Sequence, residues 1–312
     1  MTQKNARRTA LGGMITLAFA ALLLLIGSGI GIEWLTDRIA AARCMLELSA
    51  VLLTSISLSL NLRCNRFDFS LGGVAMLAPL LAWHICPSPV AGGLLSCFFG
   101  ALLSLCVCGA YTALRITPEL ASLCAALVFE GIAISLSDAA DISPRPTLMG
   151  AITVATVSIA VSFFIHVLLE KTPFGYDYRA ICISPHISRS AGVSIELNSL
   201  IVYAISGALA GGVGVLLRSL RGVEIVGINF SSVRMLFFAL LPIFVGKLME
   251  RLCPHVLGLF YGSVICSFFY SFMRELDLPQ HFRIILISAA VLMLLLYLSN
   301  EKRIKQKLLP FK

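Results

Sequence analysis

Two acidic residues lie where the surrounding chain is apolar, and each could serve chemistry or structure. Glu130 lies inside the run ALVFEGIAISL, with Ser137 further along the same segment. Carboxylates inside a membrane segment are candidates for ligand or ion binding, and a carboxylate with hydroxyl groups could replace water around a polar solute. A hydrogen bond between helices explains Glu130 equally well, so both alternatives stay open.

Asp68 precedes Ser70 and Gly72 at the start of another apolar stretch. An acidic residue at this point stabilises a helix through capping and the helix dipole, by about 0.3–1 kcal/mol. A proton relay would need an acidic or basic partner within the membrane, and the sequence offers none. We therefore expect a structural role for Asp68, Ser70 and Gly72.

The sulfur and imidazole side chains do not form a metal-binding pattern. Ten cysteines and five histidines are dispersed along the chain, without a CxxC pair or an HExxH motif. A Walker A motif and a GxGxxG loop are also missing from the sequence. We expect no metal, no cofactor and no catalytic residue, and the energy for any powered transport must come from another polypeptide.

The composition predicts a helical membrane protein. Of 312 residues, 58% are hydrophobic and 13% are charged, whereas soluble domains carry about 25% charged residues. The excess apolar surface must face lipid. The net charge of +8 is explained by basic residues at cytoplasmic loop ends, so we do not expect a nucleic-acid partner.

Ten segments are apolar enough to cross a bilayer, which requires about 20 residues each. They are residues 10–32, 44–62, 68–86, 89–114, 119–138, 148–169, 196–217, 231–249, 255–273 and 282–299. The third begins in a polar motif and the eighth is short and contains Pro242, so one of them could be broken or re-entrant. The chain, 1–312, is expected to form a single all-α transmembrane domain.

Positive charge predicts the orientation. With both termini in the cytoplasm, sixteen of the 24 basic residues, including every lysine, lie on the cytoplasmic side. This arrangement places the polar segment 171–194, KTPFGYDYRAICISPHISRSAGVS, in the cytoplasm. We predict a short helix over 176–183, with Phe174, Tyr178 and Ile181 on one side. That helix could dock into a groove of a soluble partner or lie on the lipid headgroups.

Two motifs resemble those of the membrane permeases of ribose-type ABC importers, a family that includes autoinducer-2 and branched-chain amino-acid permeases. The stretch 67–72, FDFSLG, is similar to the G-I-D-L-S-V-G motif of the sugar members. The stretch 174–181, FGYDYRAI, followed by 190–193, SAGV, resembles the F-G-x-x-x-Y-A-I motif and the loop after it. The resemblance covers roughly residues 45 to 298.

The resemblance implies a role and partners for the 171–194 loop. In the family this loop contains the coupling helix, which the ATPase subunit binds. The residues carried over are Phe174, Gly175, Tyr178, Arg179, Ala180, Ala191 and Gly192, with Arg179 where a tyrosine is common. It further implies ABC ATPase subunits, an extracytoplasmic solute-binding protein, a second permease subunit, the bacterial inner membrane and, from the FDFSLG motif, a monosaccharide as solute.

One stretch departs from the family pattern. Family members carry a glycine-rich G-G-T-S-x-x-G-G segment after the eighth helix, whereas here only Gly246 and Gly258 suggest it. Losing those glycines removes a flexible, closely packed turn. The departure is typical of a divergent member, and it leaves a homodimer and a heterodimer both open.

Further positions are assigned by their place in the chain. Arg218, Arg221 and Glu224 lie on the expected outer loop after the 196–217 segment and could form rim salt bridges with a binding protein; loop anchoring is the alternative. Gly207, Gly211 and Gly214 are spaced so that their helix can approach its neighbours closely.

Two other functions remain open from the residues. A membrane enzyme acting on lipid-linked substrates would need clustered acids or histidines at one membrane face; Asp138 and Asp141 are near each other, but Pro144 and Pro146 favour a turn there. A secondary transporter would need carboxylates in mid-helix, and only Glu130 fits.

Overall fold

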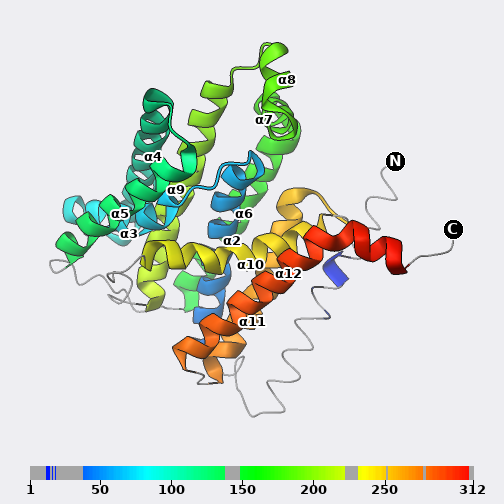
Figure 1. The fold of residues 1–312 in the computed structure, drawn as a ribbon. Helices are drawn as coiled ribbons and strands as arrows, with labels where there is room; N and C mark the ends of the chain where they lie inside the picture. Colours follow the sequence, from blue (N-terminus) through cyan, green and yellow to red (C-terminus); the bar gives the residue numbers. More distant parts are fainter. Residues whose placement is uncertain are drawn as a thin grey trace. The chain divides into compact units, whose positions relative to one another are not determined.

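The computed structural model describes residues 12–14, 16, 18, 38–137, 148–221, 231–250, 252–276 and 279–308. Every regular element among these residues is an α-helix (Figure 1). The helices are α2 (Arg38–Arg63), α3 (Ser70–Ile85), α4 (Pro89–Leu114), α5 (Pro118–Ser137), α6 (Leu148–Lys171), α7 (Pro173–Ile183), α8 (Pro185–Ser190), α9 (Ile195–Arg221), α10 (Ser231–Met249), α11 (His255–Glu275) and α12 (Gln280–Leu308).

Within the described residues, eight helices are long and apolar enough to cross a membrane: α2, α4, α5, α6, α9, α10, α11 and α12. Each coincides with one of the ten segments expected from the sequence, which confirms a multi-pass helical membrane protein. The expected segment 10–32 falls almost entirely outside the described residues. The number of ten spans and the cytoplasmic side of both termini therefore stay predictions.

The expected third span is a short buried helix. α3 has 16 residues, contains Pro79 and is shorter than a bilayer requires. It packs against α4, α5 and α9, and Met76, Leu77 and Leu80 lie in a core cluster with Ala133 of α5. Because protein covers this helix, its proline and its short length are compatible with a membrane environment. The other suspect segment, α10, is continuous through Pro242.

The chain divides into two compact units, residues 33–239 and residues 1–32 with 240–312. In the first unit α9 packs against α2, α3 and α4, and its glycines permit this. A Cβ atom on Gly207 would lie 2.4 Å from the carbonyl oxygen of Gly100, and one on Gly211 would lie 2.2 Å from that of Ser96. The close helix approach predicted from the glycine spacing is confirmed.

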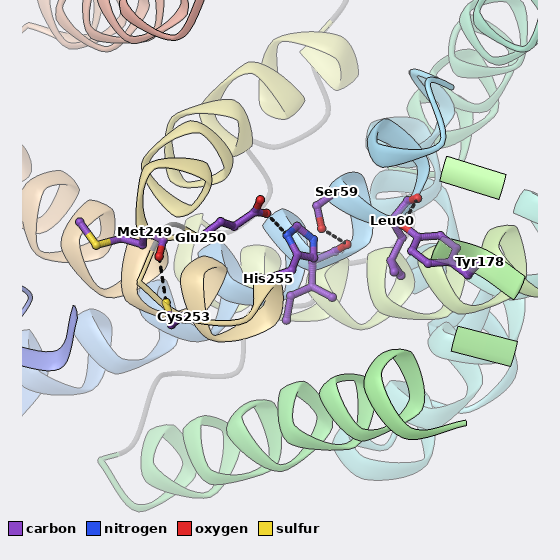
Figure 2. Close-up of polar contacts among 8 residues, drawn as sticks. Ser59, Leu60, Tyr178, Met249, Glu250, Cys253 and His255 are labelled. Atoms are coloured by element: carbon purple, nitrogen blue, oxygen red, sulfur yellow. Dashed lines mark hydrogen bonds and ion pairs between the residues drawn. The ribbon is translucent and has the colours of Figure 1, made fainter. Parts of the chain in front are cut away.

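In the second unit the two glycines of the divergent stretch face each other. A Cβ atom on Gly258 would lie 2.8 Å from the carbonyl oxygen of Gly246. Beside them, the imidazole of His255 contacts the carboxylate of Glu250 through a hydrogen bond (Figure 2). The stretch therefore keeps one close helix contact although most of the family's glycines are replaced.

Candidate functional site

Local capping signals fold the 171–194 loop into two short helices. Thr172 precedes α7, its Oγ1 accepts a hydrogen bond from the backbone N–H of Gly175 at 3.3 Å, and Pro173 occupies the first helical position. Ser184 and Pro185 repeat the arrangement at the start of α8. Gly192 ends the segment with a φ of +86°, which favours glycine. Figure 1 shows α7 and α8 following α6 and leading into α9.

One face of α7 anchors it to the membrane-spanning helices. Tyr178 is fully buried, and its hydroxyl donates a hydrogen bond to the carbonyl oxygen of Leu60 in α2 at 2.8 Å (Figure 2). Ile181 is also buried. A Cβ atom on Gly175 would lie 2.3 Å from the carbonyl oxygen of Leu169 in α6, so only glycine permits this approach.

The side of α7 that carries Phe174, Tyr178 and Ile181 is therefore turned inward. Phe174 and Tyr178 do share one side of the helix, with ring centroids 6.4 Å apart, as the spacing predicted. Because Tyr178 and Ile181 are buried within the chain, this side holds α7 in place and cannot form the docking surface.

The opposite side presents apolar residues to the surroundings. Tyr176 and Ile183 on this side of α7 are 60% and 85% exposed, Ile187 of α8 is 69% exposed, and we call these three residues the exposed apolar face. Ala191 and Gly192 are also exposed, and Ala180 is half-buried. Such a group of large apolar side chains on a short polar segment is typical of an interaction surface.

Arg179 makes contacts within the chain. Its guanidinium donates to the carboxylate of Glu170 at the end of α6, with an N–O distance of 2.7 Å. The same guanidinium lies 4.9 Å from the centre of the Tyr176 ring. Arg179 therefore joins α7 to α6 and supports one member of the exposed apolar face.

Replacing Tyr178 with phenylalanine is expected to loosen α7. The change keeps the buried ring but removes the hydrogen bond to Leu60, which costs about 1 kcal/mol. We expect faster hydrogen exchange at the amides of α7 in the purified protein, with little change in α4. Tyr111→Phe serves as the matched control because Tyr111 is on α4, and equal effects of the two changes would contradict this anchoring role.

Asp68 lies at the start of α3, in the connection from α2, and is fully buried. Its Oδ1 accepts hydrogen bonds from the backbone N–H of Ser70 at 2.9 Å and from the Ser70 hydroxyl at 2.6 Å. Its Oδ2 accepts a bond from the Nδ2 of Asn61 at 3.4 Å. Burial raises the pKa of Asp68 to about 6, and the bonds from Ser70 partly oppose that rise.

The stability of the protein is expected to depend on the protonation of Asp68. The folded pKa of about 6 exceeds the ordinary value of 3.8, so folding favours the protonated acid and this contribution is lost as pH rises from about 4 to 6. Unfolding of the detergent-solubilised protein should show a loss of about 3 kcal/mol over this range relative to Asp68→Asn. Parallel pH profiles for the two proteins would contradict the prediction.

Three helices meet at the first turn of α10. Glu130 of α5 is buried, and its carboxylate accepts hydrogen bonds from the backbone N–H and hydroxyl groups of both Ser231 and Ser232, at 2.6–3.3 Å. A Cβ atom on Gly72 of α3 would lie 2.1 Å from the carbonyl oxygen of Ser232. Glu130 therefore supplies acceptors for helix-start N–H groups that have no partner within α10, and Gly72 permits the contact.

The other candidate site residues named in the sequence analysis are Ser137, Arg218, Arg221 and Glu224. Ser137 ends α5, and its side chain lies outside the described residues, as do the side chain of Arg221 and all of Glu224. Arg218 is only 4% exposed. Contact of Arg218 with a binding protein stays a prediction.

Several polar side chains in the helix interior were missed by the sequence analysis. Asn61 of α2 donates to the Ser206 hydroxyl of α9 at 3.0 Å. Among the described residues, the Oδ1 of Asn61, the hydroxyl of Ser104 in α4 and the hydroxyl of Tyr203 in α9 are buried without a hydrogen-bond partner. The only sequence signal was a polar residue within an apolar run, which does not reveal which helices meet.

The fold and these sites define a polytopic helical membrane protein with a helical hairpin inserted between two spans. A family model described as "Branched-chain amino acid transport system / permease component" matches residues 40–299. The chain belongs to this family of ABC transporter permeases. Neither the comparison with curated proteins nor that with solved structures gave a match.

Proposed function

We propose that this chain is the membrane permease subunit of an ABC-type importer and forms the path for a small polar solute, a monosaccharide. Separate ATPase subunits supply the energy, and they bind the α7–α8 hairpin in the cytoplasm. The observation that carries the proposal is the exposed apolar face, formed by Tyr176 and Ile183 of α7 and Ile187 of α8, together with the anchoring of α7 from its other side.

The anchoring gives the hairpin a mechanical role. A force on α7 reaches α2 through the Tyr178–Leu60 hydrogen bond and reaches α6 through the Arg179–Glu170 ion pair. The close contact at Gly175 leaves no space for α7 to shift without displacing the end of α6. Closure of the ATPase subunits is therefore converted into movement of membrane-spanning helices.

The polar interior supports a hydroxylated solute. The unpartnered atoms of Asn61, Ser104 and Tyr203 belong to α2, α4 and α9, and α9 packs against both of the other helices. A buried polar group without a partner costs about 1–3 kcal/mol, which solute hydroxyls would recover. Glu130 is an additional candidate, although its oxygens already accept four hydrogen bonds.

The other partners follow from the proposed role. A solute-binding protein delivers the sugar at the outer face, where Arg218, Arg221 and Glu224 remain the candidate contacts. A second permease subunit, identical or homologous, completes the path. The location is the bacterial inner membrane.

Uptake into vesicles tests the proposal. The chain is reconstituted with its ATPase and binding protein, and the accumulation of radiolabelled monosaccharides and branched-chain amino acids is measured with and without ATP. ATP-dependent accumulation of a monosaccharide supports the proposal. Accumulation of amino acids alone rejects the sugar assignment, and catalysis or uptake by the chain without the ATPase rejects the importer.

A further inference from the structure

Two cysteines that are 118 positions apart in the sequence meet where the hairpin joins the membrane helices. Cys64 directly follows α2 and Cys182 lies in the last turn of α7, and their Sγ atoms are 2.8 Å apart. Both side chains are half-buried. We propose that Cys64 and Cys182 form a reversible disulfide that ties the coupling helix to α2. A disulfide needs about 2.05 Å between sulfurs, so the two atoms must approach by less than 1 Å.

The surroundings assign different roles to the two thiols. A hydrogen bond from Cys64 lowers the pKa of Cys182, burial opposes this shift, and the positive charges of Arg63 and Arg66 lower the pKa further. The hydrogen bond to Cys182 and burial raise the pKa of Cys64. The thiolate is the reactive form of cysteine, so Cys182 is the attacking sulfur and Cys64 the resolving one.

Hydrogen peroxide is the oxidant that suits this pair. The Cys182 thiolate attacks one peroxide oxygen, the O–O bond breaks, and the other oxygen leaves as hydroxide and takes up a proton to form water. The resulting sulfenic acid is attacked by the sulfur of Cys64, which loses its proton. An S–S bond forms and a second water leaves. Two thiols are oxidised by two electrons while one peroxide is reduced to water.

The Cys64–Cys182 disulfide would stop the coupling of ATP hydrolysis to transport. This consequence rests on the proposed function. Cys182 lies next to Ile183 of the exposed apolar face, and Cys64 lies four residues beyond Leu60, the acceptor of the Tyr178 bond. A covalent link here prevents α7, which moves with the end of α6, from shifting relative to α2, and the arrest follows from the loss of that motion. Cytosolic disulfides are usually transient and redox-sensing, which fits a site in the cytoplasm that stops import under oxidative stress.

Mass spectrometry tests the disulfide independently of transport. The full-length protein in native membranes is treated with hydrogen peroxide, alkylated and digested with trypsin. We expect the tryptic peptide 64–66 to be joined to the tryptic peptide 180–189 in most of the protein. This linked product should disappear after treatment with dithiothreitol, and it should be missing from the Cys64→Ser and Cys182→Ser variants. Cys106→Ser, which removes an exposed cysteine, should still form it. Overoxidised or unlinked Cys182 in the unmodified chain would overturn the proposal.

ATP hydrolysis by the assembled transporter tests the consequence. Peroxide should lower the stimulated rate at least fivefold in the unmodified chain, reversibly with dithiothreitol, and should leave the rate of Cys64→Ser unchanged. A linked peptide with an unchanged rate refutes the arrest while leaving the disulfide established. A reduced chain that never stimulates the ATPase instead refutes the proposed function.

Discussion

Replacing Ile183 and Ile187 together with serine is expected to weaken binding of the ATPase subunit about a hundredfold. Both side chains are exposed on the hairpin, and burying an exposed aliphatic side chain contributes about 1.5–3 kcal/mol. A loss of about 3 kcal/mol corresponds to roughly a hundredfold in the dissociation constant. Titration of the detergent-solubilised permease with labelled ATPase subunit measures this value, and stimulated ATP hydrolysis should fall with it.

The matched control places the same change outside the hairpin. Leu114 and Ile116, at the end of α4 and just after it, are also exposed apolar residues. The Leu114→Ser, Ile116→Ser double variant should bind the ATPase subunit with nearly unchanged affinity. If both double variants lose affinity equally, or if the hairpin variant loses none, the exposed apolar face is not the docking surface.

Replacing Glu130 with alanine is expected to destabilise the folded chain by about 3 kcal/mol. Two backbone N–H groups and two hydroxyls at the start of α10 lose their shared acceptor, and each buried donor left unpaired costs about 1–3 kcal/mol, although serine hydroxyls can turn to other acceptors. Glu130→Gln keeps one acceptor oxygen and should lose about half as much. Thermal unfolding in detergent measures both variants.

Glu119 provides the comparison on the same helix. It lies in the first turn of α5 and is exposed, so Glu119→Ala should leave the unfolding temperature nearly unchanged. A Glu130→Ala variant that is as stable as the unmodified chain but fails to take up solute would contradict the structural role. That outcome would instead favour the solute contact that the sequence left open.

The sequence predicted where helices form better than it predicted what each side of a helix contacts. The sequence analysis predicted one short helix over 176–183, which is part of α7, and missed α8, although the hydroxyl and proline residues at 184–185 are a local helix-start signal. A glycine spacing depends on one helix only, so the close approach of α9 follows from neighbouring residues. The spacing of Phe174, Tyr178 and Ile181 also predicted a common side of α7. Amphipathic spacing does not show whether that side meets protein or water, and here it meets α2.

Contacts between distant segments had no sequence signal. The convergence of Glu130, Gly72 and Ser232 joins three helices, and the meeting of Cys64 with Cys182 joins α7 to the end of α2. Each of these residues has an ordinary local explanation as a polar, small or apolar group in a helix. Their partners depend on how the helices pack, which periodicity alone does not determine.

The side of the membrane that the hairpin faces tests the central claim most directly. Ile187→Cys, in a chain whose ten own cysteines are replaced with serine, places a single thiol at an exposed position. A membrane-impermeant maleimide should label this thiol in inside-out vesicles and not in intact spheroplasts, and bound ATPase subunit should block the labelling. Labelling from the outside of intact spheroplasts would contradict coupling through α7 and α8.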